Sequence, residues 1–242
     1  IKPLHTHDLP PDKYICVSQA TAKDLAIHGI PQDKIEVIYH GIDNQLFNPD
    51  VDPESVISVR KNLGLDNNFV YTFFGRPGIS KGLEHLIKAA PGISARIPNS
   101  KLLLILGTDS QNKKKYDYIL DLIKTLGIEK NVKLIKPVPR EVLPQYLKAS
   151  DCVVIPSLAE GFGFCAAEAC TCGVPVVVTN KGSLPEVVSG KVAFAEPGDK
   201  DSIADAVIKV HNKKCENILP KKFKWDLSAE KYIRLYKDIL NA

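Results

Sequence analysis

The sequence predicts an α/β fold with a doubly wound, Rossmann-like parallel sheet, and three observations carry this prediction. From Asn68 onward, short β-branched runs alternate with longer helical stretches. The strand candidates carry few charges, which is typical of strands buried on both faces of a parallel sheet. The chain has 242 residues, 44% of them apolar, which is enough to bury a substantial core. In such sheets ligands bind beyond the carboxyl ends of the strands.

The predicted strands of this sheet are short and apolar, and amphipathic helices separate them. The expected strands are Val70–Phe74, Leu102–Leu106, Val132–Ile135, Cys152–Ile155, Val176–Val178 and Val192–Phe194. The expected helices are Leu83–Arg96, Lys114–Leu126, Glu141–Ala149, Cys165–Cys172 and Ser202–His211. This strand–helix alternation predicts right-handed crossovers and a sheet with helices on both faces.

The two ends of the chain differ from this pattern. A strand at Tyr14–Val17, a helix at Ala20–Ile27 and a strand at Ile35–Ile38 precede a turn-rich stretch from His40 to Asp50. We expect residues 1–43 to be the remnant of a preceding N-terminal domain plus a linker, and residues 44–225 to form the main domain. Residues 226–242 are expected to form a C-terminal helix that packs toward that N-terminal domain. Because the chain begins at Ile1 and has no methionine, we expect it to be part of a longer protein.

Composition excludes several kinds of protein. The 32 basic and 28 acidic residues leave a net charge of +4, too weak to predict a nucleic-acid partner. The longest aliphatic run, Leu102–Leu106, is far below the ~20 residues that cross a bilayer. No secretory leader is visible, so the expected location is the cytoplasm. The lysines at 113–115 and 221–224 are expected to be solvated, with at most a weak peripheral contact with an anionic membrane.

The six cysteines do not predict a disulfide framework or a metal site. Most lie in apolar surroundings, where a free cysteine behaves as a small buried hydrophobe. Cys165, Cys170 and Cys172 lack paired metal-ligand spacing. His5, His7 and Asp8 lie near the start of the chain, where a remnant of the preceding domain is the simpler interpretation. We therefore expect no metal.

The segment from Gly75 to Gly82 is the first candidate site. Gly75 ends a predicted strand, Arg76 follows it, and Lys81 stands at the start of the next helix. Two cations at a strand-to-helix turn can converge on one anion, and the helix dipole adds attraction. The planar fork of arginine and the mobile charge of lysine together suit a diphosphate. A solvated loop with two surface cations is the alternative.

The segment from Glu160 to Glu168 is the second candidate site. A predicted strand leads into a loop with Gly161 and Gly163, whose backbone amides can approach a ligand closely. Glu168 lies in a helix of small apolar residues that is expected to be buried. Because a buried carboxylate needs a partner, a ribose diol is one interpretation and an internal ion pair with a Lys or Arg is the other. Hydrolysis by two facing carboxylates is disfavoured because both come from one short segment.

These segments resemble the C-terminal, donor-binding half of a retaining glycosyltransferase of GT-B architecture, in the large family 4 (glycosyl transferases group 1). The resemblance spans nearly the whole chain and rests on several stretches in the same order. They are Ser18 to Thr21 with His40-Gly41-Ile42-Asp43, Gly75-Arg76 to Lys81-Gly82, Asp151 to Ser157, Glu160 to Glu168, Gly173 to Val177 and Leu184 to Val188. His40 stands where asparagine is usual, and Cys170 and Cys172 where small residues are common.

The resemblance implies roles for specific residues. Arg76 and Lys81, after Gly75, would bind the diphosphate of a nucleotide sugar and assist its departure. Glu160 would face the transferred sugar and Glu168 the ribose. The backbone of Gly161, Phe162, Gly163 and Phe164 would touch sugar and phosphate, and the loop near Val138 would hold the base. No cofactor or divalent metal is then required, because the cations and a helix terminus would stabilise the leaving diphosphate.

The function expected from the resemblance is metal-independent, retaining transfer of a hexose from a UDP-, GDP- or ADP-sugar. The acceptor would be a sugar, a lipid-linked compound or a small molecule, and this part of the protein alone is expected to be inactive. Two alternatives stay open at this point. One is a related nucleotide-sugar epimerase, and the other is a non-catalytic nucleotide-binding or regulatory module.

Overall fold

The structure is a computed structural model of the chain and describes residues 11–107 and 113–241. Within these residues a sheet of seven strands has the order β5-β4-β3-β6-β7-β8-β9. Its strands are β3 (Phe69–Gly75), β4 (Ser100–Leu106), β5 (Val132–Ile135), β6 (Cys152–Ile155), β7 (Val176–Thr179), β8 (Gly190–Ala195) and β9 (Glu216–Ile218). All pairs are parallel except β8 with β9, so the doubly wound sheet predicted from the sequence is confirmed.

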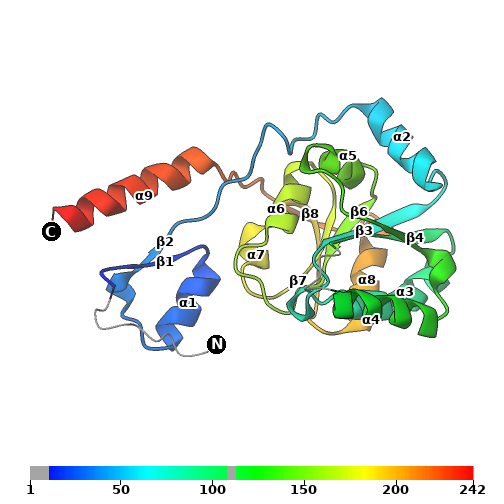
Figure 1. Cartoon of the computed structure of the whole chain (residues 1–242), viewed down its shortest axis with the longest axis horizontal. Helices are drawn as coiled ribbons and strands as arrows, with labels where there is room; N and C mark the ends of the chain where they lie inside the picture. The colour runs from blue at the N-terminus through cyan, green and yellow to red at the C-terminus, as the bar shows by residue number, and fades with distance from the viewer. Residues whose placement is uncertain (1–10, 108–112, 242) are drawn as a thin grey trace.

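Helices cover both faces of this sheet (Figure 1). They are α3 (Leu83–Arg96), α4 (Lys113–Thr125), α5 (Leu143–Lys148), α6 (Phe164–Thr171), α7 (Leu184–Val187) and α8 (Lys200–His211). Alternate strand residues enter two separate cores: Tyr71 and Phe73 pack with α3, α4 and α8, whereas Val70 and Phe74 pack with α5, α6 and α7. Burial of both faces explains why the strands have few charges.

Three elements were not predicted. The helix α2 (Pro53–Leu63) is capped by Asp52, whose side chain accepts from Glu54 N and Ser55 N, and it ends at Gly64 in the left-handed conformation. Its β-branched residues obscure the helical pattern. The helix α7 has four residues, and β9 is a mostly polar antiparallel edge strand, so neither gives a periodic signal.

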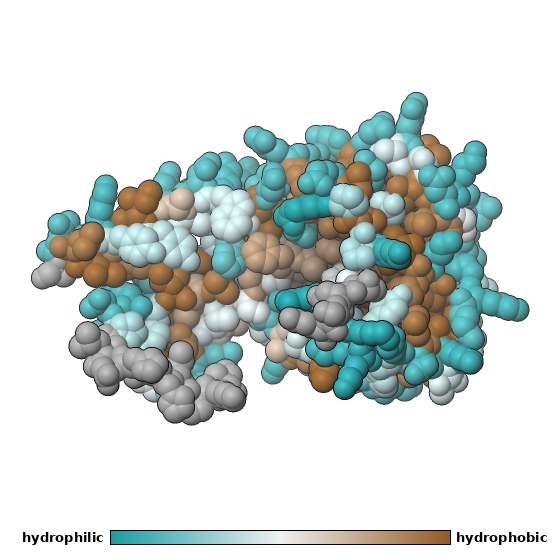
Figure 2. All heavy atoms as spheres, viewed as in Figure 1, coloured by the Kyte–Doolittle hydropathy of each residue, from teal (hydrophilic) through white to brown (hydrophobic). Residues whose placement is uncertain are grey.

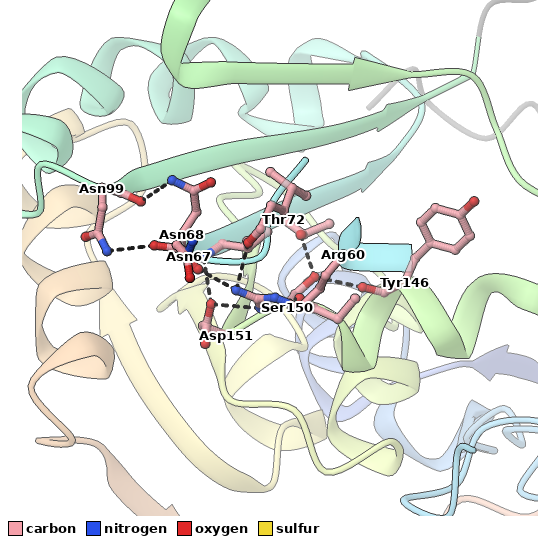
Figure 3. Close-up of polar contacts among 11 residues, drawn as sticks. Arg60, Asn67, Asn68, Thr72, Asn99, Tyr146, Ser150 and Asp151 are labelled. Carbon is pink, nitrogen blue, oxygen red and sulfur yellow. Dashed lines mark hydrogen bonds and ion pairs between the residues drawn. The ribbon is translucent and has the colours of Figure 1, made fainter. Parts of the chain in front are cut away.

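A polar network joins α2 to the amino ends of β3 and β6 (Figure 3). Arg60 on α2 donates to Ala149 O and Asp151 Oδ2, and the same Asp151 oxygen accepts from Val70 N at 2.7 Å. Thr72 and Ser150 hydroxyls lie 2.6 Å apart beside them. The network therefore fixes the edge of the sheet opposite the carboxyl ends of the strands.

The first described residues form a separate small unit. The strands β1 (Tyr14–Cys16) and β2 (Ile35–Val37) pair in parallel, with α1 (Gln19–Ile27) and one short 3-10 helix (Gln32–Lys34) between them along the chain. The linker after β2 runs beside the segment that leads into the last helix, α9 (Trp225–Leu240): Ile42 N donates to Phe223 O and Ser228 Oγ to Tyr39 O. The division of the chain at residues 43 and 44 stays a prediction.

The helix α9 projects from the main domain beside the β1–α1–β2 unit (Figure 1). The helical spacing places Leu227, Tyr232, Leu235 and Ile239 on roughly one face of this helix. Of these, Leu235 is buried, Tyr232 and Ile239 are half-buried, and Leu227 is exposed. Figure 2 shows apolar residues along this arm. In the part of the chain that the structure describes, no helix combines the length and the apolar character required to cross a membrane.

Candidate functional site

The two candidate segments lie at the point where the strand order of the sheet reverses. The neighbouring strands β3 and β6 lead in opposite directions, to β4 on one side and to β7 on the other. The loops that follow them, residues 76–82 and 156–163, are joined by hydrogen bonds from Leu158 N and Ala159 N to Ser80 O. This is the place where open α/β sheets bind their ligands.

The helices α3 and α6 begin at these loops, and each presents a bare amino terminus. Their N-caps are Gly82 (φ 65°) and Gly163 (φ 96°), and no described side chain caps either helix. A Cβ atom at Gly82 would lie 1.9 Å from Pro156 O, and one at Gly163 would lie 3.0 Å from Leu184 Cδ2. Glycine therefore allows both the backbone conformation and the close approach, which leaves the first amides of both helices able to bind an anion.

Lys81 and Glu160 form an ion pair across the two loops. Lys81 Nζ lies 2.7 Å from Glu160 Oε2, and the Glu160 side chain is 12% exposed. Ser157 Oγ donates to the same carboxylate oxygen at 3.3 Å. The Glu160 loop is itself held by Ser183, whose hydroxyl donates to Phe162 O at 2.8 Å. The site thus places a lysine charge beside a fixed carboxylate.

Arg76 follows β3 directly and is exposed. Its side-chain stem lies near Gly107, the residue after β4, because a Cβ atom there would come within 4.0 Å of Arg76 Cγ. Among residues 11–107 and 113–241, no carboxylate pairs with its guanidinium. Arg76 and Lys81 therefore both lie at the carboxyl edge of the sheet, as the turn from Gly75 predicts.

Glu168 on α6 is buried, as expected, with a side chain that is 4% exposed. Its Oε1 lies 2.9 Å from a terminal guanidinium nitrogen (Nη2) of Arg140, which comes from the loop after β5. Burial raises the pKa of Glu168, and the positive charge and hydrogen bond of Arg140 lower it in part. The sequence left two possible partners for Glu168, a ribose diol and an internal Lys or Arg. The structure shows the internal ion pair, with Arg140.

The loop residues between the two glutamates adjoin the β1–α1–β2 unit. Gly161 is exposed, and a Cβ atom there would lie 3.9 Å from Val17 Cγ2. Phe162 is buried, whereas Phe164 is partly exposed and stacks on His40 with ring centroids 5.1 Å apart. Burial lowers the pKa of His40, which keeps its ring neutral near pH 7. The loop therefore lies between the main domain and the first unit.

Sequence reasoning missed Arg140. It stands two residues after Val138, which is half-buried on the same loop. A cation just beyond the carboxyl end of a strand was the available signal, but an isolated arginine in a loop usually indicates only a solvated surface.

The cysteines are free, and those on α6 pack within the fold. Cys165 Sγ lies 3.6 Å from Phe74 O, and Cys170 Sγ accepts from Ser189 N. No group of His, Cys, Asp and Glu side chains suited to a metal ion occurs in the described ranges. His5, His7 and Asp8 lie outside the described residues.

Two family models match the chain. The model described as "Glycosyl transferases group 1" matches residues 57–225, and the one described as "Glycosyltransferase Family 4" matches residues 9–46. These two ranges include the two loops, Arg140, Glu168 and the part of the linker up to residue 46.

Curated relatives are longer than this chain. The uncharacterized glycosyltransferase MJ1607 of Methanocaldococcus jannaschii is 34% identical over 92% of this chain and 59% of its own length. The D-inositol 3-phosphate glycosyltransferase of Mycolicibacterium smegmatis is 30% identical over 82% of this chain and 45% of its own length. The chain therefore spans less than two thirds of either relative.

Among solved structures, Anabaena Alr3699/HepE in complex with UDP and glucose has a TM-score of 0.81 and 25% identity, covering 93% of this chain and 63% of that one. The switch-point site, the family model over most of the main domain and the similarity to MJ1607 agree. The chain belongs to the glycosyl transferases group 1 family, and its fold is that of the C-terminal half of a GT-B glycosyltransferase.

Proposed function

We propose that this chain binds the nucleotide-sugar donor of a retaining, metal-independent hexosyltransferase. The observation that carries the proposal is the convergence of Lys81 and the bare amino termini of α3 and α6 at the switch point of the sheet. Positive charge from a lysine and from two helix dipoles suits a diphosphate. The exposed Arg76 on the same edge supplies a second, planar cation.

We assign the remaining residues from their positions and from the family resemblance. Glu160 would face the transferred sugar, since it is fixed on the loop that adjoins the first unit. Glu168 would accept hydrogen bonds from the ribose, and the loop at Val138 would hold the base. The leaving diphosphate would be stabilised by Arg76, Lys81 and the helix termini, which is why we propose that no divalent metal is needed.

Residues 1–43 would then belong to the domain that binds the acceptor, with α9 packing toward it. Gly161 already approaches Val17 and Thr21 of this part of the chain. UDP is bound to the Anabaena HepE neighbour, so a uridine nucleotide is the first donor to test, with guanosine and adenosine nucleotides beside it.

The test is a thermal-shift panel of UDP, GDP and ADP followed by a donor assay. A ligand at 100 times its dissociation constant should stabilise the protein by about 2.7 kcal/mol. Sugar transferred to an acceptor supports the proposal, sugar isomerised without transfer identifies an epimerase, and binding without reaction by the longest available form of the protein identifies a regulatory module. No stabilisation by any of the three nucleotides contradicts donor binding.

A further inference from the structure

Glu168 is an unusual residue for its helix. The other residues in the middle of α6 are Ala166, Ala167 and Ala169, all buried, and the Glu168 side chain is 4% exposed. A carboxylate taken out of water to this degree strongly favours its protonated form unless a partner compensates. A protonated carboxyl is a poorer acceptor for a sugar hydroxyl, so its charge state bears directly on ligand binding.

Arg140 is the partner, and it is held from two sides. Its terminal guanidinium nitrogen lies 2.9 Å from Glu168 Oε1, and its guanidinium carbon lies 4.9 Å from the centroid of the Phe47 ring. Phe47 is fully buried in the linker, and its ring supports the arginine by a cation–π contact. Arg140 itself is 55% exposed, which places it between Glu168 and solvent.

The contact leaves acceptor capacity on Glu168. Only Oε1 is in the ion pair, and no other described side chain pairs with this carboxylate. Ionised carboxylates have about four lone-pair sites. The second oxygen, Oε2, is therefore the atom with lone pairs left for a hydroxyl donor.

We propose that Arg140 is a positioning residue for donor recognition, which holds the Glu168 carboxylate ionised and oriented so that it accepts hydrogen bonds from the vicinal diol of a nucleoside. This inference rests on the proposed function and adds to it a residue outside the sequence stretches on which the family resemblance was based. Arg140 acts through Glu168 in this assignment.

Other groups near Glu168 do not supply the charge. Cys165 and Cys172 face it from α6 and its end, and burial raises the pKa of each thiol to about 12, so both stay neutral between about pH 5 and 8. Lys81 and Glu160 are paired with each other on the neighbouring loops. Within the described residues, Arg140 is thus the cation that compensates Glu168.

The experiment compares Arg140→Gln, Arg140→Lys, Glu168→Gln and the double variant Arg140→Gln/Glu168→Gln, using UDP as the probe at about pH 6 and pH 8. The control is Arg96→Gln, which removes an equally charged side chain whose ion pair with Asp205 is well exposed. Carbon-13 NMR of the Glu168 carboxyl in the ligand-free protein measures its protonation directly.

We expect Arg140→Gln to weaken UDP binding about tenfold, and more at pH 6 than at pH 8, since Glu168 then protonates more readily. Arg140→Lys should restore part of the affinity, and Arg96→Gln should change nothing. The double variant should bind UDP as Glu168→Gln does, because Arg140 acts through Glu168. The Glu168 carboxyl should titrate at a higher pH in Arg140→Gln than in the wild type.

Equal or tighter UDP binding by Arg140→Gln would overturn the inference, as would additive losses in the double variant. A shifted Glu168 titration with unchanged affinity would show a purely structural ion pair and would also overturn it. Failure of the wild type to bind UDP, GDP or ADP refutes the proposed function, and this inference with it. Wild-type binding that Arg140→Gln leaves unaltered refutes the inference alone.

Discussion

Gly82 shows how much a single residue constrains the site. Its φ of 65° is close to the φ of 64° at Gly127. A Cβ atom at Gly82 would lie 1.9 Å from Pro156 O, whereas one at Gly127 would meet nothing within 4 Å. An alanine at either position has to adopt a left-handed φ, which costs about 1–2 kcal/mol for an L-residue. Only an alanine at Gly82 also collides with the Pro156 carbonyl, so comparing the two variants isolates the cost of that collision.

We predict that Gly82→Ala destabilises the protein more than Gly127→Ala does, because the alanine Cβ forces the Pro156 carbonyl to move. The displaced carbonyl belongs to the Glu160 loop, so UDP affinity should also fall in Gly82→Ala and not in Gly127→Ala. Urea unfolding and calorimetry measure the two effects. Equal free energies of unfolding for both variants would show that α3 does not depend on this close approach.

The burial of Glu168 predicts how the stability of the protein depends on pH. Burial raises its pKa in the folded protein, so the native state binds a proton more tightly than the unfolded chain. The free energy of unfolding should therefore fall as pH rises from the ordinary glutamate range through the raised pKa. Glu168→Gln has no carboxyl group to ionise and so avoids this loss. The difference in Tm between Glu168→Gln and the wild type should therefore shift in favour of the variant from about pH 4 to pH 7.

Glu84 is the control for this prediction, because its pKa is shifted in the opposite direction from that of Glu168. The hydrogen bond from Lys88 lowers the pKa of Glu84, so this carboxylate adds stability above the ordinary glutamate range and loses it as pH falls. The difference in Tm between Glu84→Gln and the wild type should therefore shift in favour of the wild type from about pH 4 to pH 7. The same sign of pH dependence in both variants would contradict the assignment for Glu168.

Between elements, Glu186 on α7 ties the main domain to the first unit. Its carboxylate accepts from Gln19 N at 3.0 Å and Ala20 N at 2.9 Å, in the first turn of α1, and from Tyr39 OH at 2.7 Å. Burial and the contact with Glu186 together raise the pKa of Tyr39 to about 12. One acidic side chain thus caps a helix of the neighbouring unit, where the helix dipole favours it.

We predict that Glu186→Ala speeds hydrogen exchange at the Gln19 and Ala20 amides roughly fivefold or more, as expected from the loss of about 1 kcal/mol of capping. Tyr39→Phe removes one bond to the same carboxylate and leaves the cap, so it should have a smaller effect at these amides. Unchanged exchange in Glu186→Ala would show that the two units do not depend on this contact.

The sequence predicted the elements whose pattern is strong. The six parallel strands and their main helices follow from alternating apolar runs, because burial on both faces imposes that composition. The elements α2, α7 and β9 were missed, since β-branched residues, a length of four residues and a polar edge, respectively, give no periodic signal.

Some features of the candidate site could be predicted from local sequence, and others could not. Arg76, Lys81 and Glu160 lie near strand ends, so local sequence predicts their shared edge. The partners of Glu168 and Glu186 do not follow from local sequence. Arg140 lies in the connection from β5 back past β4 and β3 to β6, and this connection brings it to Glu168 on the helix after β6. Glu186 and Gln19 are brought together by the linker path.

For the whole molecule, the described residues contain a seven-stranded doubly wound sheet, and the match to MJ1607 spans 59% of the length of that relative. Holding donor and acceptor in reactive geometry is worth about 7–11 kcal/mol. We predict that the 242-residue chain binds UDP but transfers no measurable sugar, and that a form extended to the length of its relatives does transfer it. Transfer by the 242 residues at the rate of the extended form would place the acceptor site within them.

The most direct test of the donor site compares UDP with uridine in Arg76→Ala, Lys81→Ala and Lys209→Ala. Lys209 lies in the last turn of α8 and controls for the loss of one positive charge. If the two cations bind the diphosphate, Arg76→Ala and Lys81→Ala should each lose about tenfold to a hundredfold in UDP affinity and keep their affinity for uridine. The UDP affinity of these two variants should also depend less on salt concentration. Lys209→Ala should match the wild type in all three measurements. Equal losses for UDP and uridine, or unchanged UDP affinity in both site variants, would contradict the assignment of this sheet edge to the diphosphate.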